Sequence, residues 1–153
     1  MTPYDRLKDL GLSLMTPAAP VANYVTHVVT GNLLFLSGQG PRHPDGRFEN
    51  GKVGREVDAE AAYAHARLVG LNLLSTAHAA LGDLGRVRRV VKLLGMVNAV
   101  PEFTDHPKVI NGCSDLFVAV LGEAGRHARS AVGMGSLPLN ITVEIEAIFE
   151  IAA

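Results

Sequence analysis

The stretch TVEIEAIFEI, residues 142–151, decides the fold class because its apolar and polar residues alternate almost perfectly. Successive side chains of a β-strand point to opposite faces. One face of this stretch is therefore apolar, with Val143, Ile145, Ala147, Phe149 and Ile151. The opposite face carries carboxylates, Glu144, Glu146 and Glu150. The pattern predicts a strand with one face against a core and the other in polar surroundings.

Two stretches before this strand have the periodicity of helices. Residues 56–81 repeat small or apolar side chains at steps of three or four, namely Ala62, Ala66, Val69, Leu73, Ala77 and Ala80. Gly82 then fits a C-cap. Residues 104–121 place one apolar face on Ile110, Cys113, Phe117 and Val120. Thr104 is the expected N-cap of this second helix, and Pro107 falls in its first turn, where proline is tolerated.

The remaining segments complete an α+β domain. Residues 25–30 and 33–37 are β-prone runs, and Gly31-Asn32 between them fits a two-residue hairpin turn. Residues 87–97 and 129–135 predict two further strands. We expect a helical turn at 4–10, an extended segment at 12–23 and a loop at 38–54. The order of hairpin, helix, strand, helix and two strands predicts a single domain over 1–153, with both helices on one face of a sheet.

Composition narrows the classes of protein that this chain can belong to. The formal net charge is −1, the hydrophobic share is 48% and the aromatic share is 5%. No basic block is present, which disfavours nucleic acid as a partner. The densest basic spot, at Arg86, Arg88 and Arg89, is interpreted as a solvated strand edge. The generous apolar share favours an oligomer.

Cysteine usage and hydropathy predict a cytoplasmic protein. Cys113 is the only cysteine, so no disulfide can form within the chain, and its place on an apolar helix face favours a core role over that of a nucleophile. No apolar run is long enough to span a membrane. Residues 1–14 lack the apolar core of a signal peptide.

Motifs for metal or nucleotide chemistry are missing. Ser37 lacks the glycine two residues earlier that a nucleophile elbow needs, and the glycines at 133–135 do not form a dinucleotide fingerprint. The six histidines include no closely spaced pair. The sequence therefore predicts no metal and no cofactor, although a zinc site built from distant residues stays open.

Three features can carry chemistry. Arg129 is the first residue of a strand of small residues. It is either a surface side chain or a guanidinium that binds a substrate carboxylate through two hydrogen bonds. Glu144 and Glu146 either face solvent or turn one carboxylate into a pocket to deprotonate a water. The glycines of the Ser37-Gly38-Gln39-Gly40-Pro41 stretch either shape a turn or let a ligand approach the backbone.

Four stretches, in order along the chain, resemble the RidA (YjgF) family. They are Tyr24-Val25 with residues 31–39, then residues 97–99, then residues 103–117, and then Arg129-Ser130-Ala131-Val132 with Leu137-Pro138 and residues 143–147. The similarity covers most of residues 20–151, and residues 104–112 resemble a bacterial subgroup of about this length. The resemblance implies a chorismate-mutase-like α+β fold and a homotrimer with ligand clefts between subunits. It also implies hydrolysis of reactive imines and enamines, such as 2-aminoacrylate, to 2-keto acids and ammonia.

The resemblance also implies roles for particular residues. Arg129 would bind the substrate carboxylate, and Glu144 would handle the attacking water. The residues expected to line the pocket are Tyr24, Ser37, Gly38, Gln39, Asn98 and Ala131. Ala131 stands where the family often has cysteine, so its backbone carbonyl is the group expected to contribute. A protonated imine is already electrophilic, so this chemistry needs neither metal nor cofactor.

Three hypotheses about function remain open. The first is a deaminase that acts on small 2-imino acids. The second is a non-catalytic trimer that binds carboxylate metabolites or a partner protein in the same cleft, which Ala131, Gly133 and Gly135 favour because they depart from the family pattern. The third, an endoribonuclease or translation inhibitor, is disfavoured by the near-neutral charge and the few aromatic residues.

Overall fold

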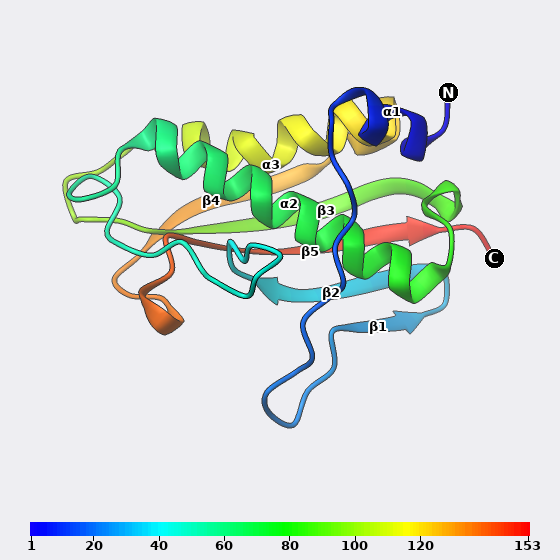
Figure 1. Ribbon diagram of the computed structural model, residues 1–153, viewed down its shortest axis with the longest axis horizontal. Coiled ribbons are helices and arrows are strands. Elements are labelled where there is room, and N and C mark those ends of the chain that lie inside the picture. The colour runs from blue at the N-terminus through cyan, green and yellow to red at the C-terminus, as the bar shows by residue number, and fades with distance from the viewer.

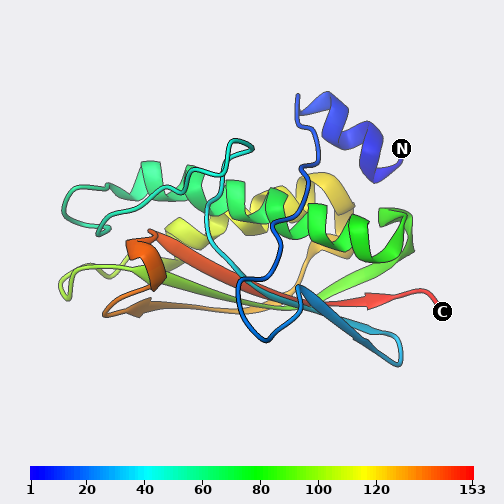
Figure 2. The ribbon, with the colours of Figure 1, turned by 60° about the horizontal axis from the view of Figure 1, so that its bottom comes forward.

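A five-stranded sheet lies under two long helices in the computed structural model, which describes residues 1–153 (Figures 1 and 2). The strands are β1 (His27–Thr30), β2 (Leu33–Gln39), β3 (Val87–Asn98), β4 (Ala128–Met134) and β5 (Val143–Ile151). The helices are α1 (Pro3–Asp9), α2 (Ala59–Leu81) and α3 (His106–Leu121), with short 3₁₀ turns at 84–86, 122–125 and 138–140. This arrangement confirms the predicted α+β fold.

The strand order is β1-β2-β5-β3-β4, so the last strand in sequence lies at the centre of the sheet. β3 and β4 are parallel and are joined through α3, whereas the other pairs are antiparallel. β1 and β4 form the two edges. The apolar side chains predicted for one face of β5 are all buried under the helices: Val143, Ile145, Ala147, Phe149 and Ile151.

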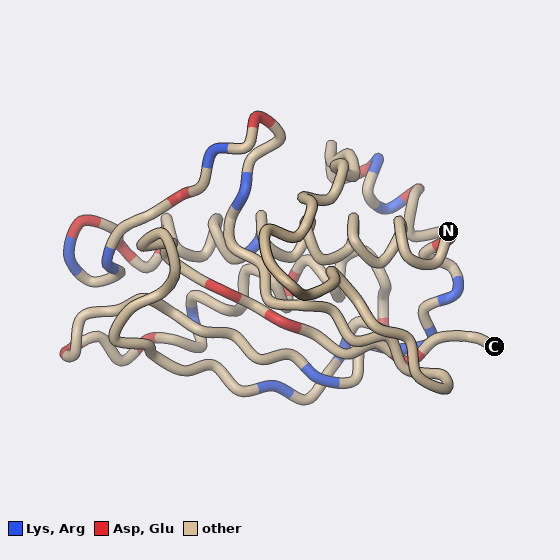
Figure 3. The backbone as a smooth tube through the Cα atoms, turned by 90° about the horizontal axis from the view of Figure 1, so that it is seen from below, with Lys and Arg blue, Asp and Glu red and all other residues tan.

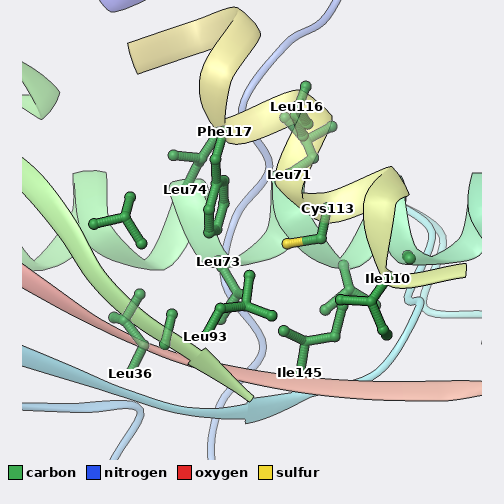
Figure 4. Packing of buried hydrophobic residues seen from close by; sticks show 14 of the residues in the cluster. Leu36, Leu71, Leu73, Leu74, Leu93, Ile110, Cys113, Leu116, Phe117 and Ile145 are labelled. Atoms are coloured by element: carbon green, nitrogen blue, oxygen red, sulfur yellow. The ribbon is translucent and has the colours of Figure 1, made fainter. Parts of the chain in front are cut away.

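The core fills the space between the sheet and the helices α2 and α3 (Figure 4). Phe117 of α3 is fully buried and meets Phe149 of β5 edge-on, with ring centroids 5.6 Å apart. Cys113 is also fully buried, and burial raises the pKa of its thiol, as expected for a core residue rather than a nucleophile.

The helix boundaries differ from the predicted ones at both N-termini. α2 begins three residues later than predicted because the side chain of Asp58 accepts a hydrogen bond from the Ala61 N–H, 2.8 Å away. This bond satisfies one of the free donors of the first turn. The prediction of Thr104 as the N-cap of α3 is wrong, since Asp105 holds that position and makes no side-chain capping bond.

The strands of the hairpin also differ from the predicted runs. Gly31-Asn32 forms the predicted turn, and Gly31 has a φ of 57°. β2 continues to Gln39, two residues beyond the predicted end, across a shift in its register with β5 between Leu36 and Gln39. Ser37 and Gly38 lie at this irregularity. β1 begins only at His27, which pairs with Leu36. The C-terminal end of β2 therefore has no β1 residue paired with it at the edge of the sheet.

Residues 10–26 connect α1 to β1 and cross α2 in the view of Figure 1. The Met15 N–H donates to the Ser75 hydroxyl of α2, 2.9 Å away, and fixes this segment on the helix. None of the helices is both long and apolar enough to cross a membrane.

Candidate functional site

A pocket lies where β2 runs past the start of β1. The segment that precedes β1 covers the free edge of β2, and a volume of about 120 Å³ remains between them. The walls consist of Ala18, Ala19, Pro20, Tyr24, Thr26, Ser37, Gly38, Gln39, Gly40, Arg42, Phe48 and Thr76. The structure therefore brings Tyr24, Ser37, Gly38 and Gln39 together, although Tyr24 lies 13 residues before Ser37 in the sequence.

Hydrogen bonds fix two of the polar side chains in this wall. The Ser37 hydroxyl donates to the Val25 carbonyl at 2.6 Å and so ties β2 to the segment that closes the pocket. The Gln39 amide donates to the Thr76 hydroxyl of α2 at 2.8 Å. The amide oxygen of Gln39 and the phenol of Tyr24 make no side-chain hydrogen bond within the chain, so both stay available to a ligand.

Glu144 lies directly beside the pocket wall. A Cβ atom added to Gly38 would lie 2.7 Å from Oε2 of Glu144, so glycine at this position lets the carboxylate approach the backbone of β2 closely. Glu144 is half-buried and has no basic partner. Burial, and then the negative charge of Glu146, raise the pKa of Glu144 above its usual range. A carboxyl group with a raised pKa is a stronger base than an ordinary carboxylate, which suits it to accept and return a proton.

Arg129 lies on the edge strand β4, under the N-terminal half of α3. Its guanidinium donates to the Ser114 hydroxyl at 3.0 Å and to the Pro107 carbonyl at 3.5 Å. No carboxylate lies within ion-pair distance of it. Its positive charge is therefore held in place by neutral acceptors and remains available to an acid group.

A hydrogen-bonded chain supports Arg129. His127 Nδ1 lies 2.6 Å from the Gly125 carbonyl, so this nitrogen donates and Nε2 accepts from the Ser114 hydroxyl, 2.9 Å away. The same hydroxyl oxygen then accepts from Arg129. Burial lowers the pKa of His127, and the nearby charge of Arg129 lowers it further, so the neutral form is favoured. Sequence reasoning missed Ser114, because nothing in the local pattern relates it to Arg129.

Arg129 and Glu144 lie on opposite faces of the sheet within one chain. Arg129 pairs with Leu93, whose side chain is buried under the helices, whereas Glu144 pairs with Met96 on the uncovered face. β3 separates the two strands, which places them roughly 10 Å apart across the sheet. The two residues cannot contact one small substrate within a single copy of the chain.

Asn98 and Ala131 are not part of the pocket in the single chain. Asn98 is fully buried, and its amide donates to the Gly51 carbonyl at 3.2 Å and to the Asn140 side chain at 2.9 Å. It therefore holds the turn that precedes β5. Ala131 is half-buried on β4, two residues from Arg129, and packs against the core. Their predicted role in binding a substrate remains a prediction for an assembly of several copies.

The structure explains one of the two glycines, Gly133 and Gly135, that depart from the family pattern. A Cβ atom at Gly133 would collide with Nε2 of His106, the first residue of α3. Gly133 thus lets the His106 imidazole lie directly on β4. A Cβ atom at Gly135 would meet nothing within 4 Å, and the structure gives no reason for glycine at this position.

Comparisons with known proteins agree with this fold. A family model described as "YjgF/chorismate_mutase-like, putative endoribonuclease" matches residues 4–151. The chain is similar to Protein TCP17 of Trypanosoma cruzi, with 45% identity over 146 residues that cover 95% of this chain and 91% of that protein.

Two crystal structures extend the comparison. A protein of unknown function from Agrobacterium tumefaciens is 51% identical, with a TM-score of 0.92, and the alignment covers 99% of this chain and 94% of that one. RidA from an Antarctic Psychrobacter species is 31% identical, with a TM-score of 0.62 and coverage of 89% and 94%. The chain therefore belongs to the RidA (YjgF/chorismate-mutase-like) family.

Proposed function

We propose that the protein hydrolyses small 2-imino acids and enamino acids, such as 2-aminoacrylate, to 2-keto acids and ammonia. The observation that carries this proposal is the carboxylate of Glu144. It lies against Gly38, which also lines the pocket, and its pKa is raised by burial and by Glu146. A carboxylate in such an environment is suited to exchange a proton with a water.

The proposed reaction begins with the imine tautomer of the substrate. Arg129 binds the substrate carboxylate through two parallel hydrogen bonds and so fixes the position of the adjacent imine carbon. Glu144 takes a proton from a water, whose oxygen forms a bond with that carbon while the electrons of the C=N bond move to nitrogen. Glu144 then returns the proton to the nitrogen. Glu144 next takes the proton of the new hydroxyl and passes it to the amino nitrogen, the C–N bond breaks with its electron pair leaving on ammonia, and the C=O bond of the keto group forms.

This reaction requires two copies of the chain, because Arg129 and Glu144 occupy opposite faces of one sheet. The uncovered face also exposes apolar side chains, including Val28 (51% exposed), Phe35 (39%) and Val132 (38%). An exposed apolar face of this kind is typical of an interface between subunits. Both features support the homotrimer with intersubunit clefts that the family resemblance implies, with Arg129 supplied by one copy and Glu144 by another.

A coupled assay tests this proposal. A serine or threonine dehydratase generates 2-aminoacrylate or its homologue, and semicarbazide captures the imine that has not been hydrolysed. We expect the wild type to accelerate release of the keto acid. Arg129→Ala should lower that rate to the uncatalysed level, whereas Arg88→Ala, which removes an exposed arginine of β3, should not. No acceleration by the wild type would reject the proposal.

The same variants test the alternative of binding without turnover. If the protein only binds carboxylate metabolites, calorimetry should detect a 2-keto acid with the wild type and not with Arg129→Ala, while the coupled assay shows no acceleration. Ala131, which replaces the cysteine common in the family, is the feature that keeps this alternative open.

Endoribonuclease activity, which the family description names, has less support from the charge distribution. The net charge is −1, and acidic and basic positions are interspersed over the side of the molecule seen in Figure 3. Proteins that bind RNA through its phosphates usually concentrate lysine and arginine on one surface. Cleavage that survived stringent purification and disappeared in Arg129→Ala would favour this function.

A further inference from the structure

We infer that the pocket at the end of β2 binds an acid group through Arg42, and that the substrates of this protein are therefore 2-imino dicarboxylates. The inference rests on the proposed function. It adds a second cationic contact to the one that Arg129 provides, and it names the class of substrate. Its basis is the placement of Arg42 in the same pocket as Tyr24, Ser37 and Gly38.

The charge of Arg42 is unbalanced within the chain. Arg42 is the only charged residue in the pocket wall, which contains no Asp or Glu. It forms no ion pair, and the one hydrogen bond of its guanidinium runs from Nη2 to the Thr16 carbonyl, at 2.7 Å. A guanidinium has five N–H donors, so most of them are left for a ligand. A half-buried cation without an anion favours a negatively charged occupant.

The backbone of Arg42 is fixed in advance. Its N–H donates to the Gly40 carbonyl at 2.9 Å, and its carbonyl accepts from the buried amide of Asn72 on α2 at 3.0 Å. The loop that carries Arg42 is also fastened to α2 by Glu49, whose Oε2 lies 3.1 Å from Nε2 of His65. The backbone of Arg42 is therefore ordered before a ligand binds, which lowers the entropy cost of binding.

The position of Arg42 relative to Gly38 indicates which part of the substrate would contact each residue. Glu144 contacts the Gly38 position from the open face of the sheet, so the reacting carbon of the substrate lies near Gly38. In the proposed reaction, Arg129 of a second copy holds the carboxylate next to that carbon. The carboxylate at the far end of the substrate then reaches Arg42. A short monocarboxylate has no second acid group, so the Arg42 guanidinium would be hydrogen-bonded by water only.

Arg42 also has a structural role that a test must separate from ligand binding. Its bond to Thr16 holds the segment that forms the opposite wall of the pocket. Loss of that bond would weaken the binding of every ligand by a similar factor. Loss of the charge would weaken dicarboxylates selectively. The ratio of the two affinities is therefore the informative quantity, and Arg42→Gln is the informative variant, because it keeps an N–H donor and removes the charge.

Calorimetry with the intact protein supplies this ratio. The probes are 2-oxoglutarate as the dicarboxylate, 2-oxobutanoate as the monocarboxylate, and inorganic phosphate. We expect the wild type to bind 2-oxoglutarate roughly tenfold more tightly than 2-oxobutanoate, and Arg42→Gln to lose that preference. Arg55→Ala should keep the preference, since Arg55 is 66% exposed and pairs with Glu56 outside the pocket.

Three results would overturn the inference: equal affinity of the wild type for both keto acids, a preference that persists in Arg42→Gln, or phosphate that binds at Arg42 more tightly than 2-oxoglutarate. The coupled assay separates this inference from the proposed function. Hydrolysis of imines without a dicarboxylate preference contradicts the inference alone. A preference that depends on Arg42, with no hydrolysis of any imine, supports the inferred acid-binding role of Arg42 and contradicts the proposed function.

Discussion

Glu144 and Arg129 carry opposite charges, and the fold leaves each of them without a counter-ion. Glu144 is half-buried beside Gly38 and Glu146, and Arg129 is held by a serine hydroxyl and a backbone carbonyl. Leaving charges in such places lowers the stability of the folded chain. Groups of this kind cluster at functional sites, where the same arrangement prepares them for a substrate.

Replacement of Glu144 should stabilise the protein while it removes activity. A carboxyl group with a raised pKa contributes stability that is fully present below its unfolded pKa, about 4.3, and that is lost as pH rises through the folded pKa. Glu144→Gln, which cannot ionise, should therefore have a larger free energy of unfolding than the wild type at neutral pH. This difference should shrink toward about pH 4, and imine hydrolysis should fall by roughly 10²–10⁴-fold.

Urea denaturation at both pH values measures this effect. The control is Glu123→Gln, whose side chain is 88% exposed and which should leave both stability and activity unchanged. A Glu144→Gln variant that is less stable than the wild type at neutral pH, or whose advantage grows on acidification, would show that burial does not disfavour the ionised carboxylate.

Ser114 should act on the reaction through Arg129, as a positioning residue. Ser114→Ala removes the hydroxyl that accepts from the Arg129 guanidinium, so the arginine loses the contact that orients it. We expect KM for the imino acid to rise roughly tenfold with little change in kcat. Ser130→Ala is the matched control, because Ser130 lies next to Arg129 on β4 and is exposed. A change in kcat alone would assign Ser114 a different role.

Among the elements, close contact between α2 and α3 sets the spacing of the two helices over the sheet. A Cβ atom at Gly112 of α3 would overlap the Tyr63 carbonyl of α2, and one at Gly70 of α2 would lie 3.2 Å from the Cys113 sulfur. Because the obstacle at Gly112 is backbone, a side-chain rotation cannot relieve the overlap. This contact keeps α3 over β3 and β4, where Ser114 and Pro107 reach Arg129.

Gly112→Ala should therefore destabilise the protein by about 3 kcal/mol, at the upper end of the usual cost of overpacking. Gly135→Ala is the control, since a Cβ atom there meets nothing and the expected change is within about 0.5 kcal/mol. Chemical denaturation of the two variants provides the comparison. A Gly112→Ala variant as stable as the wild type would mean that the helices can separate without loss of packing.

The sequence predicted the elements better than their arrangement, for a physical reason. Periodicity reports local burial, so the alternation in residues 142–151 predicted β5 almost to the residue. The central place of β5 depends on its pairing with β2 and β3, which are distant in sequence. Strand register and sheet order come from such long-range pairing, and no local pattern encodes them.

The candidate site was predictable only in part. Family resemblance pointed to Tyr24, Ser37 and Gly38, which do line one pocket. Arg42 was missed because its place in the wall depends on how the segment before β1 folds back over β2. The sequence also gave no sign that Arg129 and Glu144 lie on opposite faces, since this follows from β3 lying between their strands.

In the assembled protein, the proposed reaction requires that Arg129 of one copy and Glu144 of another act on the same substrate. Complementation between two inactive variants tests it most directly. Arg129→Ala and Glu144→Gln chains, produced together with different tags and purified as mixed oligomers, are assayed for imine hydrolysis. If sites form between copies of a trimer, each mixed trimer contains one intact site, which combines Arg129 from one variant with Glu144 from the other, so the mixed oligomers should show about a third of the wild-type activity. Mixed oligomers as inactive as either variant alone would contradict the account.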